Sequence, residues 1–140
     1  MTTKNALEPT SEQIRDFLDS HEDGAPIYML NLLKFKKTST YKDCEQVSGA
    51  EAYARYAKAF GAMLSDLGLD GVETVFGGKV DRFLIGAGAE EWDAVAIVRY
   101  PDKKSMFDAV SNETYRSFHF HRKAGLEGQL LIACDSSGVF

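Results

Sequence analysis

The run IYMLNLLKF, which follows Pro26, has only Asn31 and Lys34 as polar members among its nine residues. A strand of this composition is apolar on both faces and is typical of a sheet that is covered on both sides. The segment DAVAIVRY, residues 93–100, repeats the pattern, because both of its alternating sets of side chains have apolar middles. The two strands predict a sheet that cannot leave either face in water without exposing a large apolar patch.

Capping boxes predict two helices in the first half of the chain. One starts at Thr10 and ends before Gly24, and the other starts at Ser48 and carries apolar residues at helical spacing as far as Gly68. Between them, residues 36–47 are polar and without period, so we expect a long loop. Loops of this length are often functional or mobile.

Residues 72–85 and 92–100 are predicted to pair as an antiparallel hairpin, because only a short turn region separates them. Gly77 and Gly78 interrupt the first of these strands. A glycine pair inside a strand indicates a bulge, a bend, or the close approach of another backbone or a ligand.

The rest of the chain adds a helical region and a final strand. Asp102 predicts a helix start, and Asn112 begins a further helical segment that ends at Gly125. Residues 129–135 are predicted as the closing strand. After the leading helix the order is β-α-β-β-α-β, which predicts an α+β, ferredoxin-like antiparallel sheet with helices on one face.

The helix-free face of such a sheet still has to be covered. The simplest cover is the same face of a second subunit, which predicts a homodimeric α/β barrel with room for a small organic ligand. The length of 140 residues predicts one domain, with residues 1–24 as a helical extension and residues 25–140 as the core.

Composition excludes several functional classes. The net charge of −5 and the lack of a basic block argue against nucleic-acid binding. No signal peptide and no membrane-spanning run are recognisable, and Cys44 and Cys134 form no disulfide framework, so we expect a cytoplasmic protein without a membrane partner. The chain has no phosphate-binding glycine loop and no G-x-S-x-G elbow, and we expect no cofactor.

Four segments together resemble successive blocks of the bacterial family of unknown function numbered 1330. That family is similar to the dimeric ferredoxin-like α/β barrels, which implies the same fold and a homodimer but no established reaction. The leading helix and residues 36–47 look like additions to the compact core of such proteins. The segments that carry the resemblance are PIYMLNLLKF, SGAEAYARYAKAFG, EWDAVAIVRYP and YRSFHFHRKAGLEGQLLIA.

The stretch FHFHRKAG contains the histidines that a metal site or a catalytic group would need. In a helix, His119 and His121 lie about 200° apart and cannot share a metal ion, so no metal site is predicted. His119 is expected to be exposed to solvent. His121 lies beside Arg122 near a helix end, where it can act as an acid or base or can hydrogen-bond the last carbonyls.

Further candidates lie on the predicted strands. Asn31 is polar in an apolar strand and needs hydrogen-bond partners or a ligand. Arg99 shares a face with Asp93 and can clamp an anion or form an intersubunit ion pair. Trp92 and Tyr56 can stack on a planar ligand or pack in the interior.

Three functions compete on this basis. In the first, the dimer binds a small, partly apolar molecule beside Asn31, Tyr56, Trp92, Arg99 and His121. In the second, it is a cofactor-independent monooxygenase or isomerase of a phenolic or enolisable substrate, in which His121 moves protons and Arg99 stabilises an oxyanion. Haem degradation is a weaker version of this, because similar barrels that degrade haem use an Asn, a Trp and a His. In the third, residues 36–47 contact another protein.

Overall fold

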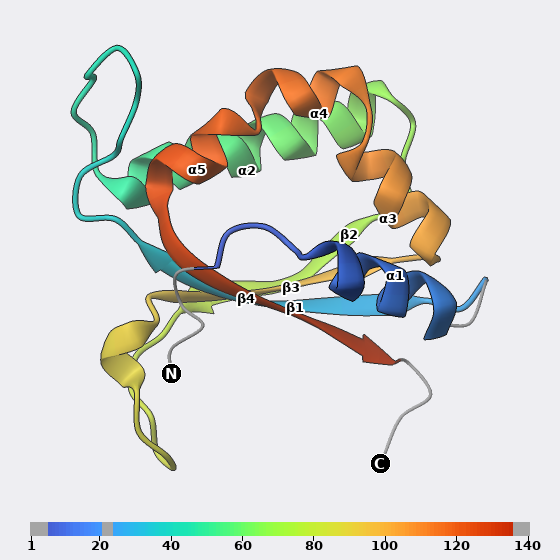
Figure 1. The fold of residues 1–140 in the computed structure, drawn as a ribbon, viewed down its shortest axis with the longest axis horizontal. Coiled ribbons are helices and arrows are strands. Elements are labelled where there is room, and N and C mark those ends of the chain that lie inside the picture. Colours follow the sequence, from blue (N-terminus) through green and yellow to red (C-terminus); the bar gives the residue numbers. More distant parts are fainter. Residues whose placement is uncertain (1–5, 21–23, 136–140) are drawn as a thin grey trace.

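The computed structural model describes residues 6–20 and 24–135, so parts of the predicted N-terminal extension lie outside it (Figure 1). Its centre is one antiparallel sheet of four strands in the order β2-β3-β1-β4. The strands are β1 (Ile27–Phe35), β2 (Glu73–Lys79), β3 (Ala94–Tyr100) and β4 (Leu126–Asp135).

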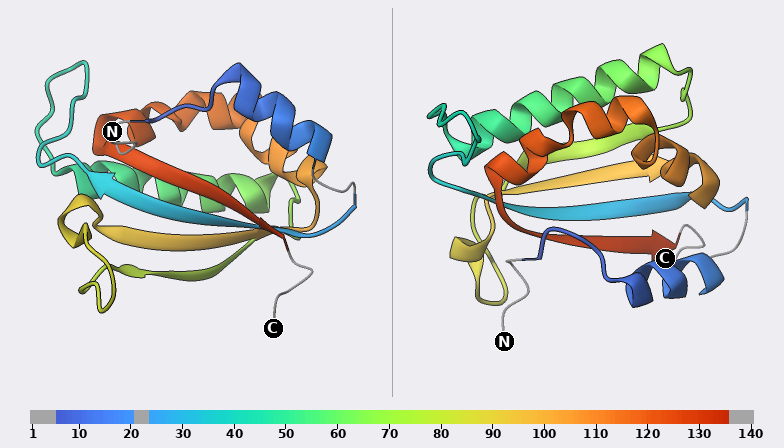
Figure 2. Two further views of the ribbon diagram at one scale, coloured as in Figure 1. Left: turned by 60° about the horizontal axis from the view of Figure 1, so that its bottom comes forward. Right: turned by 45° about the horizontal axis from the view of Figure 1, so that its top comes forward.

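Helices cover one face of this sheet, as Figure 2 shows from two sides. Three of the predicted N-caps are confirmed, because Ser48, Asp102 and Asn112 each accept a hydrogen bond from the backbone N–H three residues later. The helices are α1 (Ser11–Ser20), α2 (Gly49–Asp66), α3 (Lys103–Val110), α4 (Glu113–Phe118) and α5 (Phe120–Gly125). The predicted α+β, ferredoxin-like fold is thereby confirmed.

The core lies between the sheet and the helices. Strand β1 points its odd-numbered side chains toward the helices, and Ile27 and Met29 are buried there. Met63 of α2 is 1% exposed and packs in the same cluster with Tyr100 and Phe118. Burying side chains of this size stabilises the fold by roughly 1.5–3 kcal/mol each.

Helix α1 lies beside α3 along the β4 side of the sheet (Figure 1). Its Phe17 ring is 6.0 Å from the ring of Phe107, and Phe17 packs against the core cluster. The segment before α1 runs beside β4, where the Gln129 N–H donates to the carbonyl of Ala6 over 3.1 Å. The helical extension therefore packs against the core and covers part of one sheet edge.

Several boundaries differ from the prediction. Strand β2 ends at Lys79, not at residue 85, because the chain leaves the β3 ladder there. The helix predicted to end at Gly125 is two helices that meet at His119, and β4 starts directly after the second one. The irregularity in β2 is a bulge between Thr74 and Phe76, just before the glycine pair.

Two glycines let the start of α2 touch the end of α5. A Cβ on Gly49 would lie 2.6 Å from the carbonyl oxygen of Gly125, and a Cβ on Gly125 would lie 2.5 Å from the carbonyl oxygen of Gly49. The backbone of Lys36 joins both, since it accepts from Gly49 N–H and donates to the Gly125 carbonyl. This junction fixes both ends of the loop that follows β1.

Candidate functional site

The sheet register separates the predicted site residues. Asn31 lies opposite Ala96 and faces the helices. Arg99 lies opposite Tyr28 on β1 and Glu73 on β2, so it belongs to the other face. Asn31 and Arg99 therefore do not line one site within a single chain.

The second face, here called the open face, is not covered by any of the described helices (Figure 2). It is apolar across the four strands. Phe76 is 55% exposed and Ile132 42% exposed, and the others are partly exposed. Its apolar side chains, assigned by the register, are Leu30, Leu32, Phe76, Val95, Ile97, Leu130 and Ile132.

Arg99 and Glu73 lie at one end of the open face. They are opposite each other in the register, yet no hydrogen bond or ion pair joins them. Within the described part of the chain, the Arg99 guanidinium is without a hydrogen-bond partner. A half-buried guanidinium without a partner remains available to an anion or to an acidic side chain of another molecule.

Asn31 is the centre of a chain of polar contacts on the helix-covered face of the sheet. Its amide nitrogen donates to the carbonyls of Met29 and Ala96, each over 3.2 Å, and its oxygen accepts from Gln129 over 2.7 Å. The Gln129 oxygen in turn accepts from Arg122 over 2.6 Å. The structure thus supplies Asn31 with internal hydrogen-bond partners.

Arg122 links this chain of contacts to the segment before α1. Its guanidinium donates to the carbonyl of Leu7 and lies 3.6 Å from a carboxylate oxygen of Glu8. The Arg122 side chain is 15% exposed, whereas Glu8 is 55% exposed. The arginine next to His121 therefore connects α5 to β4 and to the N-terminal extension.

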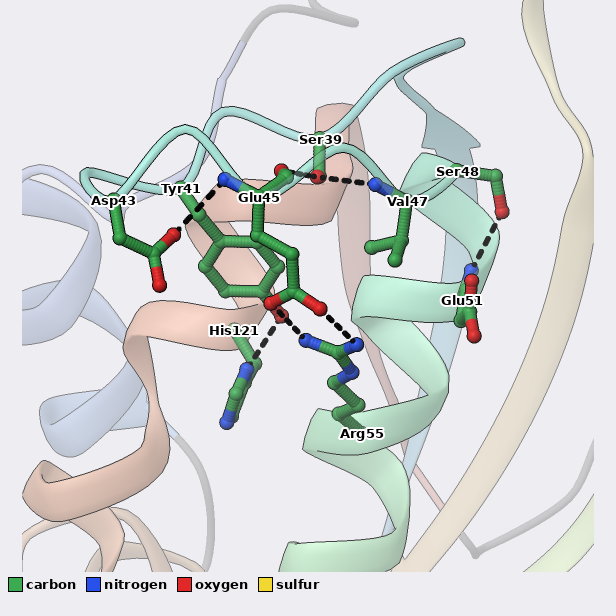
Figure 3. A network of polar contacts seen from close by, with 9 residues as sticks. All are labelled: Ser39, Tyr41, Asp43, Glu45, Val47, Ser48, Glu51, Arg55 and His121. Carbon is green, nitrogen blue, oxygen red and sulfur yellow. Dashed lines mark hydrogen bonds and ion pairs between the residues drawn. The ribbon is translucent and has the colours of Figure 1, made fainter.

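His121 lies in a different group of side chains, between the 36–48 loop and the helices (Figure 3). Its Nδ1 is 2.5 Å from the Tyr41 hydroxyl, and the Tyr41 ring lies 5.3 Å from the guanidinium carbon of Arg55. Arg55 forms two hydrogen bonds with the carboxylate of Glu45, at 2.8 and 2.9 Å. These contacts hold the loop against α2 and α5.

The surroundings of His121 favour its neutral form. Partial burial lowers the pKa of His121 below the ordinary 6.5, Arg55 lowers it further, and Glu45 opposes the shift. A neutral imidazole can act as a base through one nitrogen while it holds Tyr41 through the other. Arg99, on the open face, lies on the opposite side of the sheet from this group.

The remaining aromatic and histidine candidates are mostly engaged in packing. The Tyr56 hydroxyl is 3.0 Å from that of Tyr115, and burial is the main cause that raises the pKa of Tyr56. Trp92 is half-buried just before β3. The expectation for His119 is wrong, because its ring is half-buried, stacks on Tyr115 and hydrogen-bonds the carbonyl of Arg116.

A cleft of about 620 Å³ lies where β1 ends and α2 begins, and it was not predicted from the sequence. Lys34 and Lys36 are held by neighbouring groups, but within the described residues Lys37 and Lys79 form no hydrogen bond or ion pair. The density of lysines at positions 34–37 was the available signal. The cleft is lined by Lys34, Phe35, Lys36, Lys37, Ser48, Ala50, Lys79, Asp93 and Glu127.

Within residues 6–20 and 24–135, no three His, Cys, Asp or Glu side chains gather to hold a metal ion. In that same part of the chain, none of the helices combines the length and the apolar character that crossing a bilayer requires.

Two crystal structures of RPA0582, a protein of unknown function from Rhodopseudomonas palustris, resemble this chain over almost its whole length. One, of the methylated protein, has a TM-score of 0.84 and 31% identity over 97% of this chain and 98% of its own. The other has a TM-score of 0.81 and 32% identity over 94% of this chain and 96% of its own. This chain belongs to the RPA0582 family. No protein-family model and no curated protein matches the sequence, so membership of family 1330 stays a prediction.

More distant structures share the fold of the RPA0582 family. A dimeric ferredoxin-like protein of unknown function from Bacteroides fragilis has a TM-score of 0.51 and 6% identity over 81% of this chain and 99% of its own. A candidate antibiotic biosynthesis monooxygenase from Caulobacter crescentus has a TM-score of 0.50 and 12% identity over 82% of this chain and 92% of its own. At these identities the likeness extends to the fold alone.

Proposed function

We propose that the protein is a homodimer, joined through its open face, that binds a small, partly apolar anion. The observation that carries the dimer is the continuous apolar surface on all four strands, which the described helices leave uncovered. Soluble monomers rarely expose an apolar patch of this kind. The Bacteroides fragilis protein of the same fold is dimeric, which supports a homodimer here.

A second copy suits this face better than an unrelated partner. In a two-fold dimer the same patch meets itself, so each charged group at its end must find its complement in the other copy. Arg99 and Glu73 have opposite charges and are not paired with each other in one chain. Two-fold packing would allow each to meet the other across the interface, as an intersubunit ion pair.

The dimer is tested by mass measurement in solution, by light scattering or sedimentation equilibrium. We expect the unmodified protein to be dimeric and Ile97→Glu, in the centre of the open face, to be monomeric with an unchanged circular dichroism spectrum. Leu67→Glu is the matched control, because Leu67 is 47% exposed at the end of α2 and away from this face. A monomeric unmodified protein, or a dimeric Ile97→Glu, would contradict the proposal.

The cleft at the end of β1 is the proposed ligand site. Its volume of about 620 Å³ lies within the range of small-molecule sites. Phe35 and Ala50 supply apolar lining, and the amines of Lys37 and Lys79 supply positive charge without a competing partner in the described residues. This combination favours a carboxylate or similar anion attached to an apolar group.

Salicylate, an aromatic carboxylate with a phenol, is a suitable first probe. We expect calorimetric titration to detect binding at low salt and Lys37→Glu or Lys79→Glu to weaken it at least tenfold. Lys58→Glu, on an exposed part of α2 outside the cleft, should bind as the unmodified protein does. Equal binding by all of these variants would place the anion elsewhere.

The monooxygenase or isomerase alternative rests on His121, whose neutral imidazole contacts Tyr41. Its second group, Arg99, lies on the other side of the sheet. The haem-degrading version would need Asn31 and His121 to act together. In this structure Asn31 is hydrogen-bonded to Gln129, and His121 is hydrogen-bonded to Tyr41 in a separate group of side chains. Oxygen consumption with a phenolic substrate, lost in His121→Gln and retained in His119→Gln, would support this alternative over simple binding.

A further inference from the structure

The connection between β2 and β3, residues 80–93, has an exposed apolar tip near its middle. Leu84 is 93% exposed and Ile85 is 91% exposed, while the neighbouring Phe83 is 38% exposed. Phe83 folds back within the connection, because its ring would lie 3.8 Å from a Cβ on Gly88. Two adjacent aliphatic side chains are therefore presented almost entirely to solvent.

This connection, residues 80–93, is here called the arm. Its base is fixed to the sheet. The Asp93 carboxylate accepts from the Phe35 N–H over 2.8 Å, and the Asp93 N–H donates to the Leu33 carbonyl over 2.8 Å. Lys34 donates to the carbonyl of Glu90 over 3.0 Å. These contacts set the direction in which the arm leaves the sheet.

That direction is toward the open face. In Figure 1 the arm, drawn in yellow-green, extends past the strand ends on the side of the sheet opposite α2, α4 and α5. A second sheet packed on the open face would lie on this same side. The tip and the open face thus belong to one side of the molecule.

We propose that the arm reaches across the dimer interface and packs Leu84 and Ile85 against the second copy. This inference rests on the proposed dimer and adds a contact outside the two sheets. Leu84 and Ile85 are each more than nine-tenths exposed in the single chain, so burying them against the second copy would stabilise the dimer. By symmetry each dimer would contain two such contacts.

The charge of the arm disfavours a lipid surface as the occupant. Residues 80–93 contain one basic residue, Arg82, which is paired with Asp81 over 2.8 Å. The three other charged residues of the arm are acidic. Segments that bind the anionic membrane surface carry clusters of Lys and Arg, whereas this arm would be repelled.

The test is a sedimentation-velocity series in protein concentration on the double variant Leu84→Ser/Ile85→Ser. Both positions are solvent-exposed in the single chain, so the variant should fold. We expect the dimer dissociation constant to rise at least tenfold, whereas Leu67→Ser, at a leucine that is 47% exposed on the helix side, should change it by less than twofold.

A photo-crosslinking amino acid at position 84 gives a second, direct readout. Illumination should yield a covalent dimer, and the same group at position 67 should not. An unchanged dissociation constant together with no crosslink from position 84 would overturn the arm contact while leaving the dimer intact. A monomeric unmodified protein would overturn the dimer and the arm contact together. If the unmodified protein binds phosphatidylglycerol vesicles, and the double variant loses this binding but stays dimeric, the tip contacts lipid instead.

Discussion

Replacing Asn31 with leucine tests whether this residue serves the fold or a ligand. The leucine side chain has the same branched shape and the same number of non-hydrogen atoms as asparagine, so the substitution removes three hydrogen bonds without opening a cavity. The Gln129 amide, in a residue that is 9% exposed, loses the acceptor at 2.7 Å. Leaving one buried donor unsatisfied costs about 1–3 kcal/mol, so we expect a loss of about 2 kcal/mol in the free energy of unfolding.

The double variant Asn31→Leu/Gln129→Leu sharpens this test. Gln129→Leu alone should also cost about 2 kcal/mol, because it leaves the Asn31 oxygen unpaired and removes an acceptor from Arg122. In the double variant both buried amides are replaced by apolar groups, while Arg122 keeps Glu8 and the Leu7 carbonyl. The total loss should therefore be at least about 1 kcal/mol smaller than the sum of the two single losses.

Urea unfolding at one fixed protein concentration measures all three variants, because the stability of the proposed dimer would depend on concentration. Single losses below about 0.5 kcal/mol, or strictly additive losses, would refute the idea that the hydrogen bonds joining Asn31, Gln129 and Arg122 stabilise the fold as a unit. If Asn31 serves a ligand instead, Asn31→Leu would leave the unfolding free energy unchanged and weaken ligand binding.

Three further predictions concern the junction and the loop. Gly49→Ala should cost roughly 3 kcal/mol or more in urea unfolding, since its Cβ would clash with the backbone of Lys36, whereas Gly61→Ala, with open space on the same helix, should gain about 0.5–1 kcal/mol. Ser48→Ala should cost about 1 kcal/mol in the same assay because α2 loses its N-cap bond. The pKa of His121 is lower in the folded protein than the ordinary 6.5 of the unfolded chain, so between these two values unfolding takes up a proton. The free energy of unfolding should therefore fall as the pH drops through this window. His121→Gln should flatten this part of a profile of stability against pH.

Local signals in the sequence predicted most of the fold. Ser48, Asp102 and Asn112 were identified as caps because an N-cap bond spans three residues and depends on little else. The strand order followed from the succession of elements and from the two-sided apolar character of β1 and β3. The length of β2 was wrong, because the sequence FLI has strand-like composition whether it pairs or lies exposed at a tip.

The candidate sites depended on contacts that no local pattern contains. His121 meets Tyr41 across 80 residues, and Gln129 meets Asn31 across 98. Which of several polar groups becomes the partner is decided by strand register and by the path of the 36–48 loop. Strand alternation did place Arg99 correctly relative to its own strand, but it could not show that Arg99 and His121 would lie on opposite sides of the sheet.

The edges of the two outer strands, β2 and β4, determine whether a strand of another molecule can extend the sheet. A bulge at residue 75 interrupts the free rim of β2, and Ala6 occupies the outward N–H of Gln129 on β4. A neighbouring strand would therefore find no long, regular rim to extend, which disfavours open-ended fibres. Edge-to-edge growth beyond the proposed dimer is therefore not expected, and removing the residues before Leu7 would take away one of these two barriers.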